Sequence, residues 1–176
     1  AYTFANNLQK VSETARRIPL VASLLKSPWS RGVVLVAGLS KAAWEDNLRK
    51  GVWLSWLAGK TKLDPESHMG YLMFSSMIQF RLGNLNAARE FIEKALGDPY
   101  VQENEQWTGT VNVIYSFICM LSGEHDKMAQ ICHELLRLGQ KYDAPHQMGV
   151  AHRRLAHLYL GKELLDRARQ EFELSR

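Results

Sequence analysis

The chain has 176 residues, 46% of them hydrophobic, which is enough for one domain with a sizeable core or for a short array of repeats. Its net charge of +4 comes from interleaved acidic and basic residues, an excess too small to indicate a nucleic-acid-binding protein. Two cysteines exclude a disulfide framework, and no apolar run is long enough for a membrane span, so we expect a cytoplasmic protein or one from another reducing compartment.

Two helices are predicted at the start of the chain. Residues 2 to 16 carry an apolar face at helical spacing, formed by Phe4, Leu8, Val11 and Ala15. A shorter helix is predicted from Leu20 to Leu25, because Pro19 suits a first helical turn and Pro28 follows soon after. We expect this N-terminal segment to pack on the rest of the chain.

The stretch from Trp29 to Lys41 invites comparison with a nucleotide site. Val33 to Ala37 is rich in β-branched residues, and Gly38, Ser40 and Lys41 follow it. A phosphate-binding loop needs a second glycine upstream at a fixed spacing, and none is present. We therefore predict a buried helix over residues 29 to 38, with Ser40 as the N-cap of the next helix and no cofactor.

Residues 41 to 58 are predicted to form a strongly apolar helix. One face carries Trp44, Leu48, Val52 and Ser55, and a second face carries Trp53, Trp56 and Leu57. A helix that is apolar on two faces must be covered on both. Either the tryptophans pack against the first helices, or they form a surface for a partner, since aromatic residues anchor interfaces.

An internal repeat organises the rest of the chain. Residues 69 to 95 read as two helices joined by a tight turn at Gly83. Four sets of residues recur 40 positions apart: Ser76, Ser116 and Ala156; Phe80, Met120 and Leu160; Ala88, Met128 and Ala168; and Ile92, Cys132 and Phe172. The turn position itself is occupied by Gly83, Gly123 and Glu163. This spacing predicts three similar helical hairpins.

The register resembles the tetratricopeptide repeat (TPR) family in a long-period variant. The motif residues are Leu72, Ser76, Ala88, Ile92 and Ala95 in the first hairpin, Tyr115, Ser116, Met128, Cys132 and Leu135 in the second, and Leu155, Ala156, Tyr159, Ala168 and Phe172 in the third. Small side chains at the crossing let two helices approach closely, and large ones fill the space beside it. The resemblance covers about residues 65 to 176.

The resemblance also implies a binding surface on the first helix of each hairpin. The positions that line the concave face in this family correspond to Gly70, Met73, Met77, Phe80 and Arg81, to Thr110, Val113, Phe117, Met120 and Leu121, and to Val150, Arg153, His157, Leu160 and Gly161. From these we predict a partner-binding groove formed by Met73, Met77, Phe80, Arg81, Val113, Phe117, Met120, Arg153 and His157.

The predicted groove is apolar, with cations at its rim. An apolar, Met-bearing surface is costly to leave in water, so we expect an amphipathic helix, an extended peptide or a segment of the same chain to fill it. The open alternative is that tighter packing buries these residues. Arg81, Arg153 and Arg154 would steer acidic flanks of a ligand. The Lys and Asn residues with which some family members hold the acidic C-termini of heat-shock chaperones are absent from these positions, so this class of partner is disfavoured.

No catalytic or metal-binding set stands out. The histidines are His68, His125, His133, His146, His152 and His157, and none is spaced as a pair of metal ligands on one helix face. No nucleophile elbow is present. Cys119 and Cys132 occupy core positions of one hairpin, so we interpret both as buried, reduced thiols. We predict no enzyme activity, no metal and no cofactor.

Together these patterns predict an all-α protein, a right-handed superhelical stack of antiparallel helix hairpins. Residues 1 to 64 would form an N-terminal helical segment, and residues 65 to 176 three TPR-like hairpins. The predicted function is a non-catalytic scaffold that binds a protein or peptide. The alternative is an effector-sensing regulatory domain of a larger protein, similar to maltose-activator-type transcription regulators. Because the pattern stops at Arg176 without a polar capping helix, we also expect further chain, a partner or another copy there.

Overall fold

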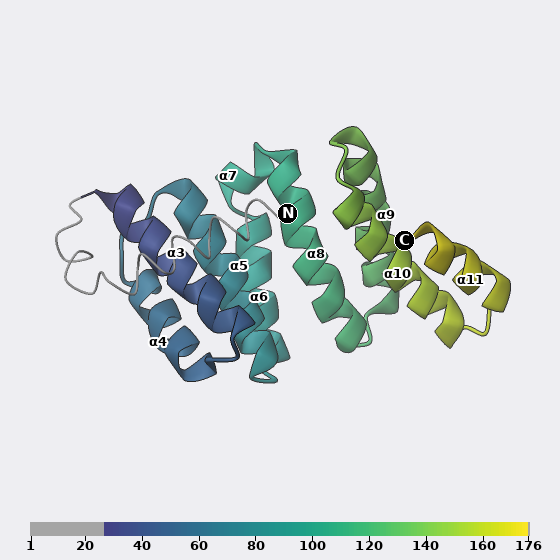
Figure 1. The fold of residues 1–176 in the computed structure, drawn as a ribbon, viewed down its shortest axis with the longest axis horizontal. Coiled ribbons are helices and arrows are strands. Elements are labelled where there is room, and N and C mark those ends of the chain that lie inside the picture. The colour runs from purple at the N-terminus through teal and green to yellow at the C-terminus, as the bar shows by residue number, and fades with distance from the viewer. Residues whose placement is uncertain (1–26, 176) are drawn as a thin grey trace. The chain divides into compact units, whose positions relative to one another are not determined.

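The computed structural model describes residues 27–175, and every regular element among them is a helix (Figure 1). The helices are α3 (Pro28–Trp44), α4 (Leu48–Gly59), α5 (Pro65–Arg81), α6 (Leu85–Leu96), α7 (Pro99–Gln102), α8 (Glu105–Leu121), α9 (His125–Lys141), α10 (Pro145–Gly161) and α11 (Leu165–Leu174). This confirms the all-α prediction for the described residues. The helices expected over residues 2–16 and 20–25 lie outside them.

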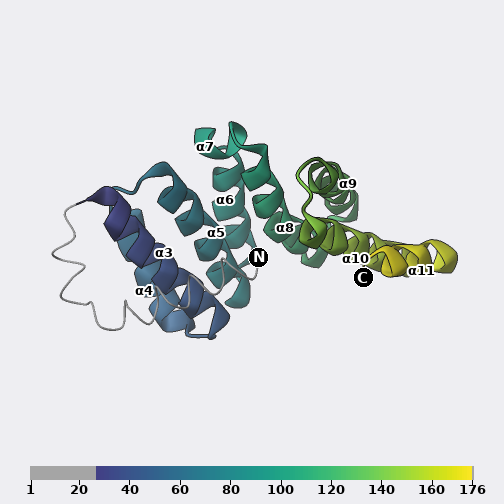
Figure 2. The same cartoon turned by 45° about the horizontal axis from the view of Figure 1, so that its top comes forward.

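The helices pair with their neighbours in sequence. The chain divides into an N-terminal unit, Ala1–Tyr100, and a C-terminal unit, Val101–Arg176. In the N-terminal unit α3 pairs with α4 and α5 with α6, and these pairs lie side by side in both views (Figures 1 and 2). In the C-terminal unit α8 pairs with α9 and α10 with α11, while α10 also packs on α9 and α8. The result is a series of helical hairpins, as the repeat predicts.

The turns of the three repeated hairpins share one geometry. Gly83, Gly123 and Glu163 adopt left-handed backbone conformations with φ of 80°, 74° and 59°. In each turn the next N–H donates to the carbonyl five residues back at 2.9 Å: Asn84 to Gln79, Glu124 to Cys119, and Leu164 to Tyr159. This is the bond pattern of a Schellman C-cap, which a glycine accommodates without strain. The 40-residue spacing seen in the sequence is therefore repeated in the backbone.

The small residues of the repeat lie in the core of each hairpin. Ser76, Ser116 and Ala156 are fully buried. The Ser76 hydroxyl donates to the Ala88 carbonyl of α6 at 2.7 Å, so the two helices meet at this residue. The Ser116 hydroxyl donates to the Asn112 carbonyl of its own helix at 2.8 Å, which satisfies a buried polar group. The Ser76 contact confirms the predicted crossing in the first of the three hairpins.

The predicted boundary between the first two described helices is wrong. Ser40 is not an N-cap: α3 runs through it, buries it and ends at Trp44. The break comes at Asp46, whose φ is 55°, and the Asn47 side chain caps α4 by accepting from the Lys50 N–H at 3.3 Å. Leu39 and Ala43, on either side of Ser40, belong to the core that α3 shares with α4 and α5, so the helix continues through this position. A Cβ on Gly32 would stand 2.3 Å from the Ser67 hydroxyl oxygen, so the helices approach closely there.

The predicted domain boundary between residues 64 and 65 lies inside the N-terminal unit. Asp64 accepts from the Ser67 N–H at 3.1 Å and caps α5, with Pro65 in the first turn. Helices α3 and α5 pack together across this connector. The helices before and after Asp64 therefore share one core.

Candidate functional site

The nine predicted groove residues fall in both units. Helix α5 carries Met73, Met77, Phe80 and Arg81, helix α8 carries Val113, Phe117 and Met120, and helix α10 carries Arg153 and His157. Each group is therefore described within its own unit. Within each unit the question is whether these side chains are free for a partner or engaged in packing.

In the N-terminal unit most of the predicted side chains are engaged. Met73 is buried, and Met77 packs against the core cluster of Leu39, Ala43, Leu54, Ala58, Phe74 and Ile78. Arg81 donates to the Ala43 carbonyl at the end of α3 and pairs with Asp46 at 2.7 Å. Its charge is thus compensated inside the protein. Met73, Met77 and Arg81 therefore already have contacts within the N-terminal unit.

In the C-terminal unit α8 presents an apolar stripe. Val113, Phe117 and Leu121 are spaced four residues apart and so share one face of the helix. Val113 is half-buried, Phe117 is 36% exposed and Leu121 is 49% exposed. Leu121 belongs to the family's groove positions but not to the nine residues we selected. The exposed part of the stripe leaves apolar surface available to a partner.

Arg154 on α10 lies against this stripe. Its guanidinium donates to the Val113 carbonyl at 2.6 Å and lies 5.4 Å from the centre of the Phe117 ring. The side chain is half-buried, and the loss of hydration lowers the pKa of Arg154 to about 10, with the neighbouring charge of Arg153 acting in the same direction. The sequence placed Arg154 at the groove rim. Its contacts with α8 could not be read from the sequence.

His157 lies on the exposed side of α10 and contacts the last helix. Its ring meets the Phe172 ring edge-on, with centroids 5.4 Å apart. Nearby, His152 Nδ1 lies 2.7 Å from a Glu171 carboxylate oxygen. These two contacts hold α11 against α10. His157 therefore has a packing role, besides any contact with a partner.

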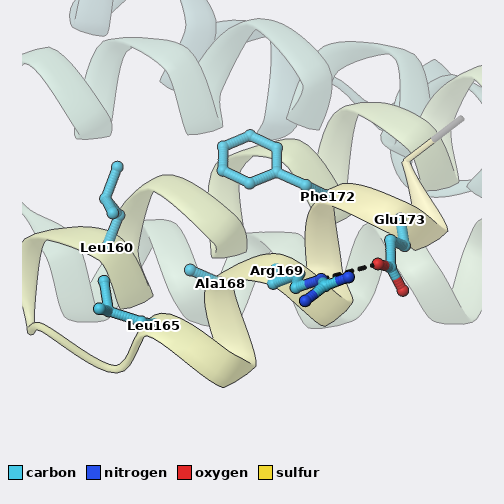
Figure 3. Close-up of a pocket in the computed structure, with 6 residues that line it drawn as sticks. All are labelled: Leu160, Leu165, Ala168, Arg169, Phe172 and Glu173. Atoms are coloured by element: carbon cyan, nitrogen blue, oxygen red, sulfur yellow. Dashed lines mark hydrogen bonds and ion pairs between the residues drawn. The ribbon is translucent and has the colours of Figure 1, made fainter.

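A hollow of about 550 Å³ opens beside the last hairpin (Figure 3). It is lined by Leu160, Leu165, Ala168, Arg169, Phe172 and Glu173. Arg169 and Glu173 pair at 3.1 Å at one end, while Leu160 and Leu165 lie at the other (Figure 3). Phe172 is 36% exposed, whereas its repeat equivalents Ile92 and Cys132 are fully buried. An apolar position that the two preceding hairpins cover is thus uncovered here.

Cys119 and Cys132 are both fully buried thiols outside any disulfide, as predicted. Burial raises the pKa of the Cys132 thiol to about 11, and this outweighs the opposing effect of the Arg154 charge. A thiol with a raised pKa carries little thiolate at neutral pH and is a poor nucleophile. The pair fits a structural interpretation.

The tryptophans behave differently from core residues. Trp44, Trp53 and Trp56 are all exposed. The first two predicted helices, against which we expected them to pack, lie outside the described residues, so that interpretation stays a prediction.

Between residues 27 and 175 no group of His, Cys, Asp or Glu is arranged to hold a metal ion. In that same stretch no helix has the length and apolar character needed to cross a bilayer.

Comparison with known proteins supports the fold. No protein-family model matches the sequence, and no curated protein matches it significantly. The structure is similar to the crystal structure of BtubC (BKLC) from P. vanneervenii, with a TM-score of 0.66 and 20% sequence identity. The match covers 99% of this chain and 70% of that chain. At this identity it shows the fold alone, which is a series of sequential helical hairpins.

Proposed function

We propose that the chain is a non-catalytic binding module that holds a protein or peptide on the first helices of its hairpins. A TPR-like fold implies protein partners in general, and it builds surfaces from helix faces without a dedicated catalytic centre. The observation that carries the proposal is the exposed stripe on α8, formed by Phe117 and Leu121, with the guanidinium of Arg154 over the Phe117 ring.

The shape of the apolar stripe on α8 indicates which kinds of polypeptide fit against it. Side chains four residues apart on one helix present a narrow apolar strip. Such a strip suits an amphipathic helix, which can lay its own apolar face along it, or an extended segment with alternating apolar residues. The exposed Arg153 and His157 on α10 add polar contacts at the edge. A rim of this kind affects the rate and specificity of association more than affinity.

The test is loss of partner capture without loss of fold. F117A combined with L121A removes the exposed stripe, and V52A, an exposed apolar residue on α4, is the matched control. We expect pull-down and mass spectrometry to recover partners with the wild type and V52A but not with the double variant, at unchanged helicity. Capture that survives the double substitution would show that the stripe is not the binding surface.

A second candidate function rests on the hollow beside α11. The lining of this open hollow combines apolar side chains with one ion pair, the two kinds of contact that hold a small molecule. In that case the chain would be an effector-sensing domain of a larger regulator. A metabolite panel in a thermal shift assay separates the two functions. A sensor gains stability from a small molecule, a scaffold only from a polypeptide.

A further inference from the structure

The guanidinium of Arg154 lacks a carboxylate partner within the part of the chain that the structure describes. Its contacts there are the Val113 carbonyl at 2.6 Å and the Phe117 ring at 5.4 Å. An arginine has five N–H donors in a planar fork, so most of its hydrogen-bonding capacity remains unused by these contacts. A half-buried cation is normally paired, because burial removes much of its hydration.

A second arginine that bridges two helices shows how a nearby carboxylate can balance such a charge in this protein. Arg81 on α5 also donates to a main-chain carbonyl of a neighbouring helix, that of Ala43. It differs in having Asp46 at 2.7 Å to balance its charge. The charge of Arg153, the preceding residue, has the same sign as that of Arg154 and lowers its pKa. Among residues 27–175, Arg154 is therefore an arginine in a bridging position without a counter-ion.

We propose that Arg154 receives a carboxylate of the bound partner, while an apolar residue of the same partner lies on Phe117 and Leu121. This inference rests on the proposed function and names the chemistry of its ligand. The Val113 bond and the Phe117 ring fix the guanidinium plane, and a fixed plane suits two parallel hydrogen bonds to a carboxylate. Partial burial strengthens such a pair relative to one in water.

Arg154 is not one of the groove positions at which members of the family bind acidic C-termini. That comparison concerned the groove positions of each first helix, where Lys and Asn are absent. Arg154 lies one residue beyond Arg153 and reaches the stripe through its contacts with α8. A carboxylate can come from an Asp or Glu side chain or from a chain terminus, and the experiment separates these sources.

The probe is an array of synthetic ten-residue peptides in a Gly/Ser background. Each carries one Leu, Phe or Trp and, one to four residues away, either Glu or its neutral counterpart Gln, with an amidated C-terminus. A second set lacks Glu and ends in a free carboxylate or an amide. The array is probed with the whole chain as wild type, R154Q, R154K and R167Q. Arg167 is the matched control, because it lies over the Tyr159 ring at 6.0 Å but on α11.

We expect the wild type to retain the best carboxylate peptides about tenfold better than their neutral counterparts. R154Q should lose this preference, R154K should weaken it, and R167Q should keep it. If R154Q does not fold, R154K decides, and an unchanged preference in R154K overturns the inference.

The remaining outcomes separate the inference from the proposed function. Equal retention of carboxylate and neutral peptides by the wild type overturns the inference but leaves peptide binding in place. A preference that persists in R154Q does the same, because the carboxylate then binds elsewhere. A wild type that retains no peptide of either kind overturns the proposed function and the inference with it.

Discussion

Replacing Arg154 by methionine should leave the stability of the protein nearly unchanged, although this side chain is half-buried and bridges two helices. Burial lowers the pKa of Arg154 to about 10. Measured from the usual value near 12.5, the charged form is disfavoured in the folded state by about 3 kcal/mol at neutral pH. Because the folded pKa is lowered, this cost is fully present below pH 10 and is relieved only as the pH rises through that value.

The contacts of Arg154 offset this cost. A hydrogen bond from a charged donor contributes about 1.5 to 3 kcal/mol, and the contact with the Phe117 ring about 1 kcal/mol. Methionine gives up these contacts, removes the buried charge and still packs on the ring. The terms nearly cancel, so we expect R154M to change the free energy of unfolding by less than about 1 kcal/mol.

The assay is urea denaturation at neutral pH followed by far-ultraviolet circular dichroism. The matched control is I118A, because Ile118 is fully buried in α8 and its truncation should destabilise by about 2 to 5 kcal/mol. A loss in R154M as large as that in I118A would refute the reasoning. It would show that Arg154 is retained for stability, and that its lack of a carboxylate has no functional meaning.

Three further predictions test the repeat and the contacts within the C-terminal unit. E163G should raise the free energy of unfolding by about 1 kcal/mol, and G123A should lower it by a similar amount, because both positions have positive φ; thermal melts of the two variants check this. S116W should abolish the cooperative circular-dichroism melt of the C-terminal unit, since Ser116 is fully buried at a helix crossing, and an unshifted melt would mean that the register is misplaced. Hydrogen bonds from Lys141 and Tyr142 lower the pKa of Glu105. Their stabilising effect is therefore present above the ordinary glutamate pKa and is lost as the pH falls below about 4. The difference in unfolding free energy between wild type and E105Q, measured by urea titration at several pH values, should shrink over that range.

The hairpins could be predicted because the information that fixes them is local and periodic. A small residue at a crossing and a turn residue with positive φ are needed once per hairpin, and the sequence supplies both at the same spacing. Ser116 and Gly123 show this directly, one buried at the crossing and the other in the left-handed turn.

The boundary at Ser40 could not be predicted, because its cause is not local. A serine before a lysine is a common N-cap, and nothing nearby argues against that assignment. In the structure Ser40 is buried and α3 packs closely on α5, where a Cβ on Gly70 would stand 2.8 Å from Val36. That contact joins residues far apart in the sequence. Tertiary packing here overrides the local capping signal.

The candidate site was accessible from the sequence only in part. Phe117 and Val113 follow from the family register, and the structure places both on one face of α8. Arg153 and Arg154 look interchangeable in the sequence, yet they point about 100° apart around the helix axis. Only Arg154 reaches Val113 and Phe117. Which of two adjacent arginines meets the neighbouring helix depends on packing that no spacing rule provides.

The two bridging arginines also indicate where recognition resides in this fold. The positions 40 and 80 residues after Arg81 hold Leu121 and Gly161, and the position 40 residues before Arg154 holds Ile114. Neither arginine therefore belongs to the repeat, whose buried small residues already build the hairpins. Residues outside the repeated pattern are free to differ between hairpins without disturbing the stack. Both arginines close a helix contact, but within the described part of the chain only Arg81 has a counter-ion, Asp46. We therefore expect the departure from the repeat at Arg154, and not the repeat itself, to select the partner.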